Sequence, residues 1–173
     1  MATIKKICLA AMCAGSLALV AAAPAAAFPP VGSTVTGVDD GRGFDFGALT
    51  TCHVSLSGTV TSQDPWGGGG IRVNRFSFTG CTSGVTVAAN SLPWTLGTDS
   101  TLAAALYPLD VNITTSRGTC RYSGSLLGST NGAGTWWFTE SVYKRTSGCG
   151  GANELRTRVT LKLRDSAGQP VGM

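Results

Sequence analysis

Beyond residue 27, the sequence predicts an all-β protein, a single-domain sandwich or flattened barrel of about eight to ten short strands. Short runs of alternating apolar and polar residues recur between clusters of Gly, Asn, Asp and Ser, whereas helix signals are nearly absent. Four cysteines in this part of the chain form two pairs with the same spacing. Together these patterns indicate a disulfide-bonded β domain.

The first 27 residues have the order of a secretory signal peptide. Lys5 and Lys6 precede an apolar run over residues 7–20, and Ala25–Ala27 supply the small residues of a cleavage site. The apolar run is too short to span a bilayer comfortably. We therefore expect cleavage near Ala27, a secreted domain over residues 28–173, an extracellular or cell-wall location, and no membrane anchor.

The first strands follow from alternation. A strand is expected around Val31–Val38, and residues 39–43 are expected to form a turn. The clearest early strand is Cys52–Thr61, because Cys, Val, Leu, Gly and Val share one face. Residues 71–79 should form the next strand. Its apolar spacing changes phase between Val73 and Phe76, which predicts a β-bulge.

The middle of the chain is expected to contain two short strands, 85–89 and 92–96, with Pro93 confining the second to an edge or to a strand end. Ser100 is expected to cap a short helical turn through Leu106, which Pro108 would end.

Four strands are expected towards the C-terminus, over residues 109–114, 120–126, 136–143 and 155–164. In the last of these, leucines and Val159 alternate with basic residues. The final segment, 165–173, is expected to be a frayed tail.

The cysteines beyond residue 27 number four, an even count that predicts two disulfides in an exported chain. Three pairings are possible. We favour Cys52–Cys81 and Cys120–Cys149, because 28 residues lie between the cysteines of each pair. The two segments closed by these pairs, residues 52–81 and 120–149, have similar patterns but few identical residues. This indicates two similar structures rather than a clear internal duplication.

Charge is unevenly distributed along the chain. Without Lys5 and Lys6, the 13 basic residues fall to 11 against 9 acidic ones, so a nucleic-acid partner is not expected. Residues 117–173 nevertheless hold eight basic and three acidic residues.

The sharpest electrostatic feature is a basic row on the last strand, formed by Arg156, Arg158, Lys162 and Arg164. Residues two apart on a strand share a face. Two interpretations stay open. The row is either a contact for an anionic cell-wall polymer or glycan, or a solvated face that protects a sheet edge, with Glu140 and Glu154 neutralising part of its charge.

Aromatic side chains are the second candidate contact, because a flat ring on a β surface can stack on a sugar. The candidates are Trp66, Trp136 and Trp137. Since Trp136 and Trp137 are adjacent, they should face opposite sides of a strand. Trp94 alternates with two leucines and is expected in the core.

Signals of catalysis are weak. His53 is the only histidine and no G-x-S-x-G elbow occurs, so no catalytic residue, metal or cofactor is expected. The acidic cluster of Asp39, Asp40 and Asp45 is interpreted as a turn because calcium-loop spacing is missing. Two alternatives stay open, an inhibitor or effector acting through an exposed loop at Asp64–Gly70, and a small hydrolase built on Asp/Glu pairs.

Several motifs resemble those of small secreted bacterial β-proteins that contain disulfides and have no known activity. They are Cys52-x-Val-x-Leu-x-Gly-x-Val60, Phe78-Thr79-Gly80-Cys81, Leu92-Pro93-Trp94 and Cys120-x-Tyr-x-Gly-x-Leu126. The resemblance implies the fold and secretion only. We expect a secreted, non-catalytic binding or cell-envelope-associated protein.

Overall fold

A computed structural model describes residues 28–63 and 68–172 of the protein, and within these ranges it contains ten strands and one short 3-10 helix. The strands are β1 Thr34–Asp39, β2 Phe44–Asp45, β3 Thr51–Gln63, β4 Gly69–Thr79, β5 Thr86–Ala89, β6 Trp94–Thr98, β7 Ala103–Thr115, β8 Gly118–Thr130, β9 Thr135–Lys144 and β10 Glu154–Asp165; the 3-10 helix η1 is Thr82–Gly84. In the described ranges, no helix has the length and hydropathy needed to cross a membrane.

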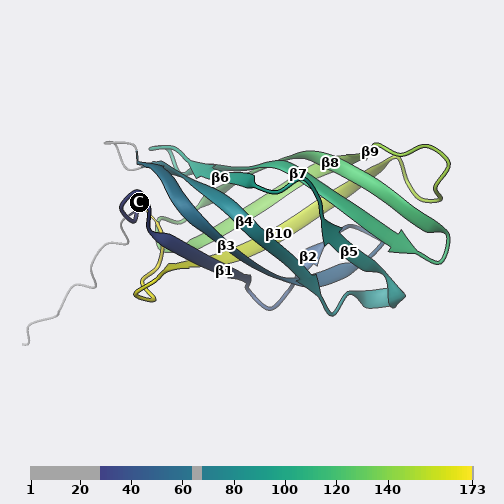
Figure 1. Cartoon of the computed structure of the whole chain (residues 1–173), viewed down its shortest axis with the longest axis horizontal. Coiled ribbons are helices and arrows are strands. Elements are labelled where there is room, and N and C mark those ends of the chain that lie inside the picture. The colour runs from purple at the N-terminus through teal and green to yellow at the C-terminus, as the bar shows by residue number, and fades with distance from the viewer. Residues whose placement is uncertain (1–27, 64–67, 173) are drawn as a thin grey trace, which may run out of the picture.

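The strands close into an antiparallel barrel. β1 pairs with β3 on one side and with β10 on the other, which joins the two ends of the series and closes a ring of eight strands with two extra ones. Figure 1 shows this elongated barrel, with the C-terminus at its left-hand end. The all-β prediction is confirmed. Of the two predicted architectures, the barrel matches. The sandwich does not form, because every strand of the ring is paired with a neighbour on both sides.

Two strands of the ring, β1 and β6, are interrupted, and the two extra strands, β2 and β5, lie in line with them. β2 follows β1 along β3 and β10, and β5 lies beyond β6 along β7. The first break is the turn expected at residues 39–43. There the Asp39 carboxylate accepts hydrogen bonds from the backbone N–H groups of Gly41 at 2.9 Å, Gly43 at 3.1 Å and Val54 at 2.8 Å. The carboxylate of Asp39 therefore stabilises the backbone of the turn.

Alternation places the core as expected. Cys52, Val54, Leu56 and Val60 of β3 are buried, and so is Trp94 of β6. The expected bulge in β4 is confirmed, because the β3–β4 register shifts between the pairs Ser57–Arg75 and Gly58–Val73. Apolar side chains from strands around the ring therefore fill the interior of the barrel, as an eight-stranded barrel allows.

The helical turn expected at residues 100–106 is wrong. Residues 103–115 form β7, which pairs with β8 along most of its length and with β6 over residues 104–107. Ala and Leu favour helix locally, but Ala104 and Leu106 alternate into the core, and pairing on both sides outweighs the local preference. Pro108 does not end an element; it lies inside β7, where the β7–β8 register shifts.

The frayed tail expected at residues 165–173 is also wrong as far as residue 172, the last one described. Val171 is buried, its N–H donates to the Leu163 carbonyl at 3.0 Å, and its carbonyl accepts a hydrogen bond from the Trp136 indole at 3.1 Å. The C-terminal segment folds back because it covers apolar side chains at one end of the barrel.

Both expected disulfides are present, Cys52–Cys81 and Cys120–Cys149. Each joins the beginning of the first strand of a hairpin to the residues just after its second strand. The hairpins are β3–β4 and β8–β9. The two similar segments, residues 52–81 and 120–149, are thus two β-hairpins that are each closed by a disulfide in the same way.

Candidate binding face

The basic row lies on the outside of the barrel. Along β10, the side chains of Leu155, Val159 and Leu161 point into the core, and the alternate residues are exposed except for the half-buried Thr160. β10 pairs with β9 on one side and with β1 and β2 on the other. Arg158 and Lys162 have paired residues on both sides of β10, so protection of a free sheet edge does not explain their charges.

Trp137 lies next to this row. The register of β9 and β10 pairs Trp137 with Thr160, and the neighbouring outward pairs are Thr139 with Arg158 and Thr135 with Lys162. Trp137 is 41% exposed, whereas Trp136 is fully buried. Residues diagonal to each other on paired strands lie about 7–8 Å apart, within reach of long side chains. Trp137 is therefore flanked by two cations, and we call Trp137 with Arg156, Arg158, Lys162 and Arg164 the cationic face.

The charges of the cationic face are free of carboxylate partners within the described ranges. The ion pairs within the described ranges are Arg42–Asp40, His53–Asp39 and Arg121–Asp110, and none of them involves a residue of the cationic face. Glu140 and Glu154 form no ion pair with the row, so the expected partial neutralisation does not occur through direct contact. Arg164 donates to the backbone carbonyl of Gly168 at 2.6 Å, which orients its guanidinium without neutralising it.

A small hollow of about 100 Å³ lies beside two of these arginines. It is lined by Asp45, Gly47, Thr139, Arg156, Thr157 and Arg158. The volume equals that of about three liquid waters, enough for one carboxylate or sulfate group. Two guanidiniums favour an anion there, whereas the Asp45 carboxylate favours a group that donates a hydrogen bond. The hollow is therefore suited to a ligand that carries both an acid and hydroxyl groups.

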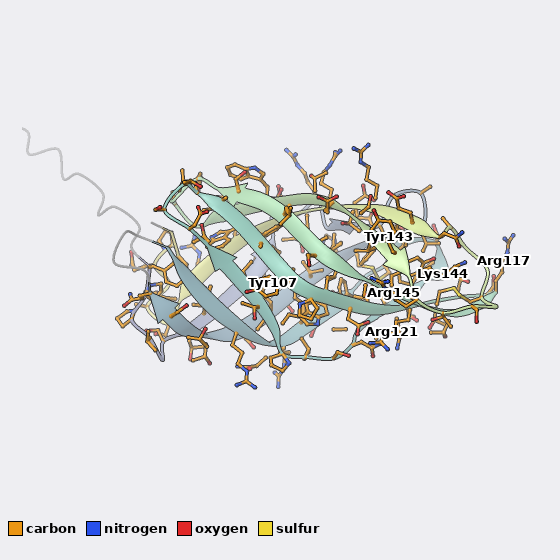
Figure 2. The ribbon with its side chains drawn as sticks, turned by 90° about the horizontal axis from the view of Figure 1, so that it is seen from above. Tyr107, Arg117, Arg121, Tyr143, Lys144 and Arg145 are labelled. Atoms are coloured by element: carbon orange, nitrogen blue, oxygen red, sulfur yellow. A yellow bond between two sulfur atoms is a disulfide. The ribbon has the colours of Figure 1, made fainter. Side chains whose placement is uncertain are left out.

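A second basic region, which the sequence patterns did not single out, continues around the barrel on β8 and β9. Figure 2 shows Arg121, Tyr143, Lys144 and Arg145 within one region of the surface. Arg145 donates to the Ser123 hydroxyl at 2.7 Å, Lys144 donates to the Gly151 carbonyl at 3.1 Å, and Tyr143 is 49% exposed. The signal that pointed here was the excess of basic residues over 117–173.

Arg121 forms an ion pair with Asp110. Its Nε donates to Asp110 Oδ1 at 2.8 Å, and its Nη2 donates to Asp110 Oδ2. These bonds, which outweigh burial, hold the pKa of Asp110 below its usual value, and the same carboxylate raises the pKa of Arg121. The pair links β7 to β8, so Arg121 contributes to the barrel wall.

The pKa values of three described carboxyls, Asp39, Asp99 and Asp110, are lowered. Burial raises the pKa of Asp39, but hydrogen bonds from Val54, His53, Gly41 and Gly43 outweigh it and leave this pKa below the usual value. A general acid at neutral pH needs a raised pKa instead. The pKa of Asp99 is also lowered, chiefly by hydrogen bonds from Thr101.

His53 lies on the outside of β3. Its Nδ1 is 3.2 Å from Asp39 Oδ2, and its side chain is 61% exposed. In the part of the chain that the structure describes, no group of three or more His, Cys, Asp or Glu side chains is placed to hold a metal ion. Trp66 and most of the loop expected as a contact lie outside the described residues.

Comparison with known proteins identifies a family. A family model described as alkane oxidation protein activator PraA/PraB-like matches residues 1–163. No curated protein and no solved structure matches the chain.

Proposed function

Because the chain belongs to the alkane oxidation protein activator PraA/PraB-like family, we propose that it is an exported, non-catalytic accessory protein that binds an acidic polysaccharide through its cationic face. The family is named for an activator, which is compatible with a protein that supports an oxidation without carrying it out. Two disulfides are typical of extracellular proteins. The signal-peptide pattern of residues 1–27 also supports export.

The observation that carries the proposal is the position of Trp137 between Arg158 and Lys162 on the outer surface. An indole ring can stack on the apolar face of a sugar, and the flanking cations can bind sugar carboxylates. The nearby hydroxyls of Thr135, Thr139 and Thr160 can exchange hydrogen bonds with sugar hydroxyls. These groups match the three chemical features of an acidic polysaccharide.

Attachment to a cell-envelope polymer would hold the protein outside the cell, where water-insoluble alkanes first arrive. The protein would then act by its location and its contacts. Such a role requires no catalytic residue, metal or cofactor.

The two other hypotheses have less support. The loop of the inhibitor hypothesis, residues 64–70, is described only from residue 68 onward. The hydrolase hypothesis needs a carboxyl with a raised pKa, and the shifted carboxyls of the described ranges are all lowered.

The proposal is tested by sedimentation. The protein, residues 28–173 with both disulfides formed, is mixed with isolated bacterial cell wall or with insoluble acidic and neutral polysaccharides at low and high salt. We expect it to sediment with the acidic material at low salt and to remain in solution at high salt, because salt screens exposed charges. Failure to sediment with any of these materials would contradict the proposal.

Matched variants separate the cationic face from overall charge. Arg156→Gln/Arg158→Gln should sediment less, and so should Trp137→Ala. Arg72→Gln/Arg75→Gln removes the same charge from exposed positions of β4, elsewhere on the barrel, and should sediment like the wild type. Equal loss in both double variants would show that only net charge matters.

A further inference from the structure

A second site lies at the end of the barrel that carries Cys120 of β8. There a pocket of about 250 Å³ opens between the β7–β8 hairpin, η1 and the loop after β9. Its walls are mainly apolar and include Leu49, Val85, Ile113, Cys120 and Tyr122. We call it the mouth pocket. Mouths of β-barrels are common places for small ligands.

The walls of the mouth pocket are held by specific contacts. The Tyr122 hydroxyl donates to the Ala152 carbonyl at 3.0 Å, and the Cys120–Cys149 disulfide ties β8 to the loop after β9. On the other side, the Thr50 hydroxyl donates to the Thr82 carbonyl at 3.0 Å and so fastens η1. The pocket therefore exists before a ligand arrives, which lowers the entropy cost of binding.

Arg117 lines the pocket from the turn between β7 and β8, and it lies at the right-hand tip of the molecule in Figure 2. Its aliphatic stem runs past Gly150, where an added Cβ would be 3.2 Å from both the Cβ and the Cδ of Arg117. Arg117 is exposed, and among the described residues no carboxylate pairs with it. One uncompensated cation thus stands beside an apolar pocket.

From this arrangement we propose that the mouth pocket binds a medium-chain fatty acid, with the hydrocarbon tail inside and the carboxylate on the guanidinium of Arg117. A closed apolar cavity of about 150 Å³ takes up apolar ligands. The mouth pocket is larger, although it opens to solvent and its lining also includes Ser83, Thr115 and Ser116. Its volume equals about eight liquid waters. A methylene group needs about as much space as a water molecule, so the pocket holds a tail of about eight carbons.

The fatty-acid site is distinct from the proposed polysaccharide site, because it lies in the mouth pocket and not on the outer face of β9 and β10, and it needs neither Trp137 nor the arginines of β10. The two proposals can fail separately.

The experiment is isothermal titration of the disulfide-bonded protein at pH 7 with hexanoate, octanoate, decanoate and dodecanoate below their micelle concentrations. Each added methylene should tighten binding by about fourfold. The gain should stop once about eight carbons are buried. Decyltrimethylammonium, which carries a cationic head on a ten-carbon chain, should bind more weakly than decanoate.

Variants test the two parts of the site. Arg117→Gln should weaken decanoate binding by about fivefold, the effect expected for an exposed charge pair. Arg72→Gln, the same change on β4, should leave it unchanged. Val85→Phe should fill the pocket and abolish binding; if this variant does not fold, the chain-length series and Arg117→Gln still decide.

Absence of binding to every fatty acid would overturn the proposal. So would affinity that rises with chain length without limit and is equal for the two head groups, because surface adsorption behaves in that way. Decanoate binding unchanged by Arg117→Gln would overturn the assignment of the carboxylate to Arg117.

Discussion

The Asp110 carboxylate on β7 accepts two hydrogen bonds from the Arg121 guanidinium on β8, and the pair joins these neighbouring strands beside the segment that separates β5 from β6. The Asp110 side chain is 5% exposed and that of Arg121 is 49% exposed. The Asn90 N–H, from the segment between β5 and β6, donates to the Asp110 carbonyl at 2.7 Å. The ion pair therefore fixes the wall where one strand of the ring is interrupted.

Acid should weaken this pair. Because the pKa of Asp110 is lowered in the folded protein, the carboxylate stabilises the fold above the unfolded pKa of about 3.9. That contribution is lost as pH falls through the lower, folded pKa. Asp110→Asn should cost roughly 2 kcal/mol of unfolding free energy at pH 7. Urea titrations should show the difference from wild type shrinking below about pH 4; a difference independent of pH would refute this role.

The adjacent tryptophans should differ sharply in their effect on stability. Trp136 is fully buried and donates to the Val171 carbonyl, so Trp136→Ala should cost about 3–5 kcal/mol of unfolding free energy. Trp137 is 41% exposed, and Trp137→Ala should change it by about 0.5 kcal/mol or less. Urea unfolding of the two variants checks both values, and similar losses would show that Trp137 is a structural residue.

Gly128 and Gly97 provide a matched pair on the barrel wall. A Cβ at Gly128 would overlap the carbonyl oxygen of Trp137, whereas a Cβ at Gly97 would meet its nearest atom, Gly69 O, at an ordinary 3.5 Å. Gly128→Ala should destabilise the protein by about 1–3 kcal/mol, because backbone atoms must move. Gly97→Ala should be neutral or slightly stabilising. Thermal unfolding of both variants gives the answer, and equal tolerance would contradict the close strand approach at Gly128.

The two disulfides should contribute similarly to stability, because both join cysteines 29 positions apart. The chain-entropy relation gives about 3.5 kcal/mol for each. Replacing either pair by Ser should lower the unfolding free energy by about that amount in urea titrations. A much larger loss for one pair would mean that its contribution depends on native contacts around the bond rather than on loop closure.

Alternation predicted which side chains face inward on most strands, because a strand with one buried face needs apolar residues at every second position. It could not distinguish a sandwich from a barrel, since both bury one face of each strand. Closure depends on β1, which joins β3 to β10 across more than one hundred residues of sequence. The helical turn expected at residues 100–106 was wrong because local preference carries no information about flanking strands.

The composition of the cationic face was visible in the sequence, but its arrangement was not. Alternation placed Arg156 and Arg158 on one side of a strand and showed that Trp136 and Trp137 must face opposite ways. The pairing of Trp137 with Thr160 depends on the register of β9 and β10, which alternation leaves open. The ion pair of Asp110 and the mouth pocket beside Arg117 were not foreseen, because each depends on contacts between separate strands or loops.

The most direct test of the central proposal is the dissociation constant for polygalacturonate, a soluble polymer of sugar carboxylates, measured against salt concentration. For the wild-type protein, binding should weaken steadily as salt rises. Arg156→Gln/Arg158→Gln should bind more weakly at low salt and depend less on salt, whereas Arg72→Gln/Arg75→Gln should follow the wild type. If the two double variants gave the same curve, or if the wild type did not bind at low salt, the cationic face would not be the polysaccharide site.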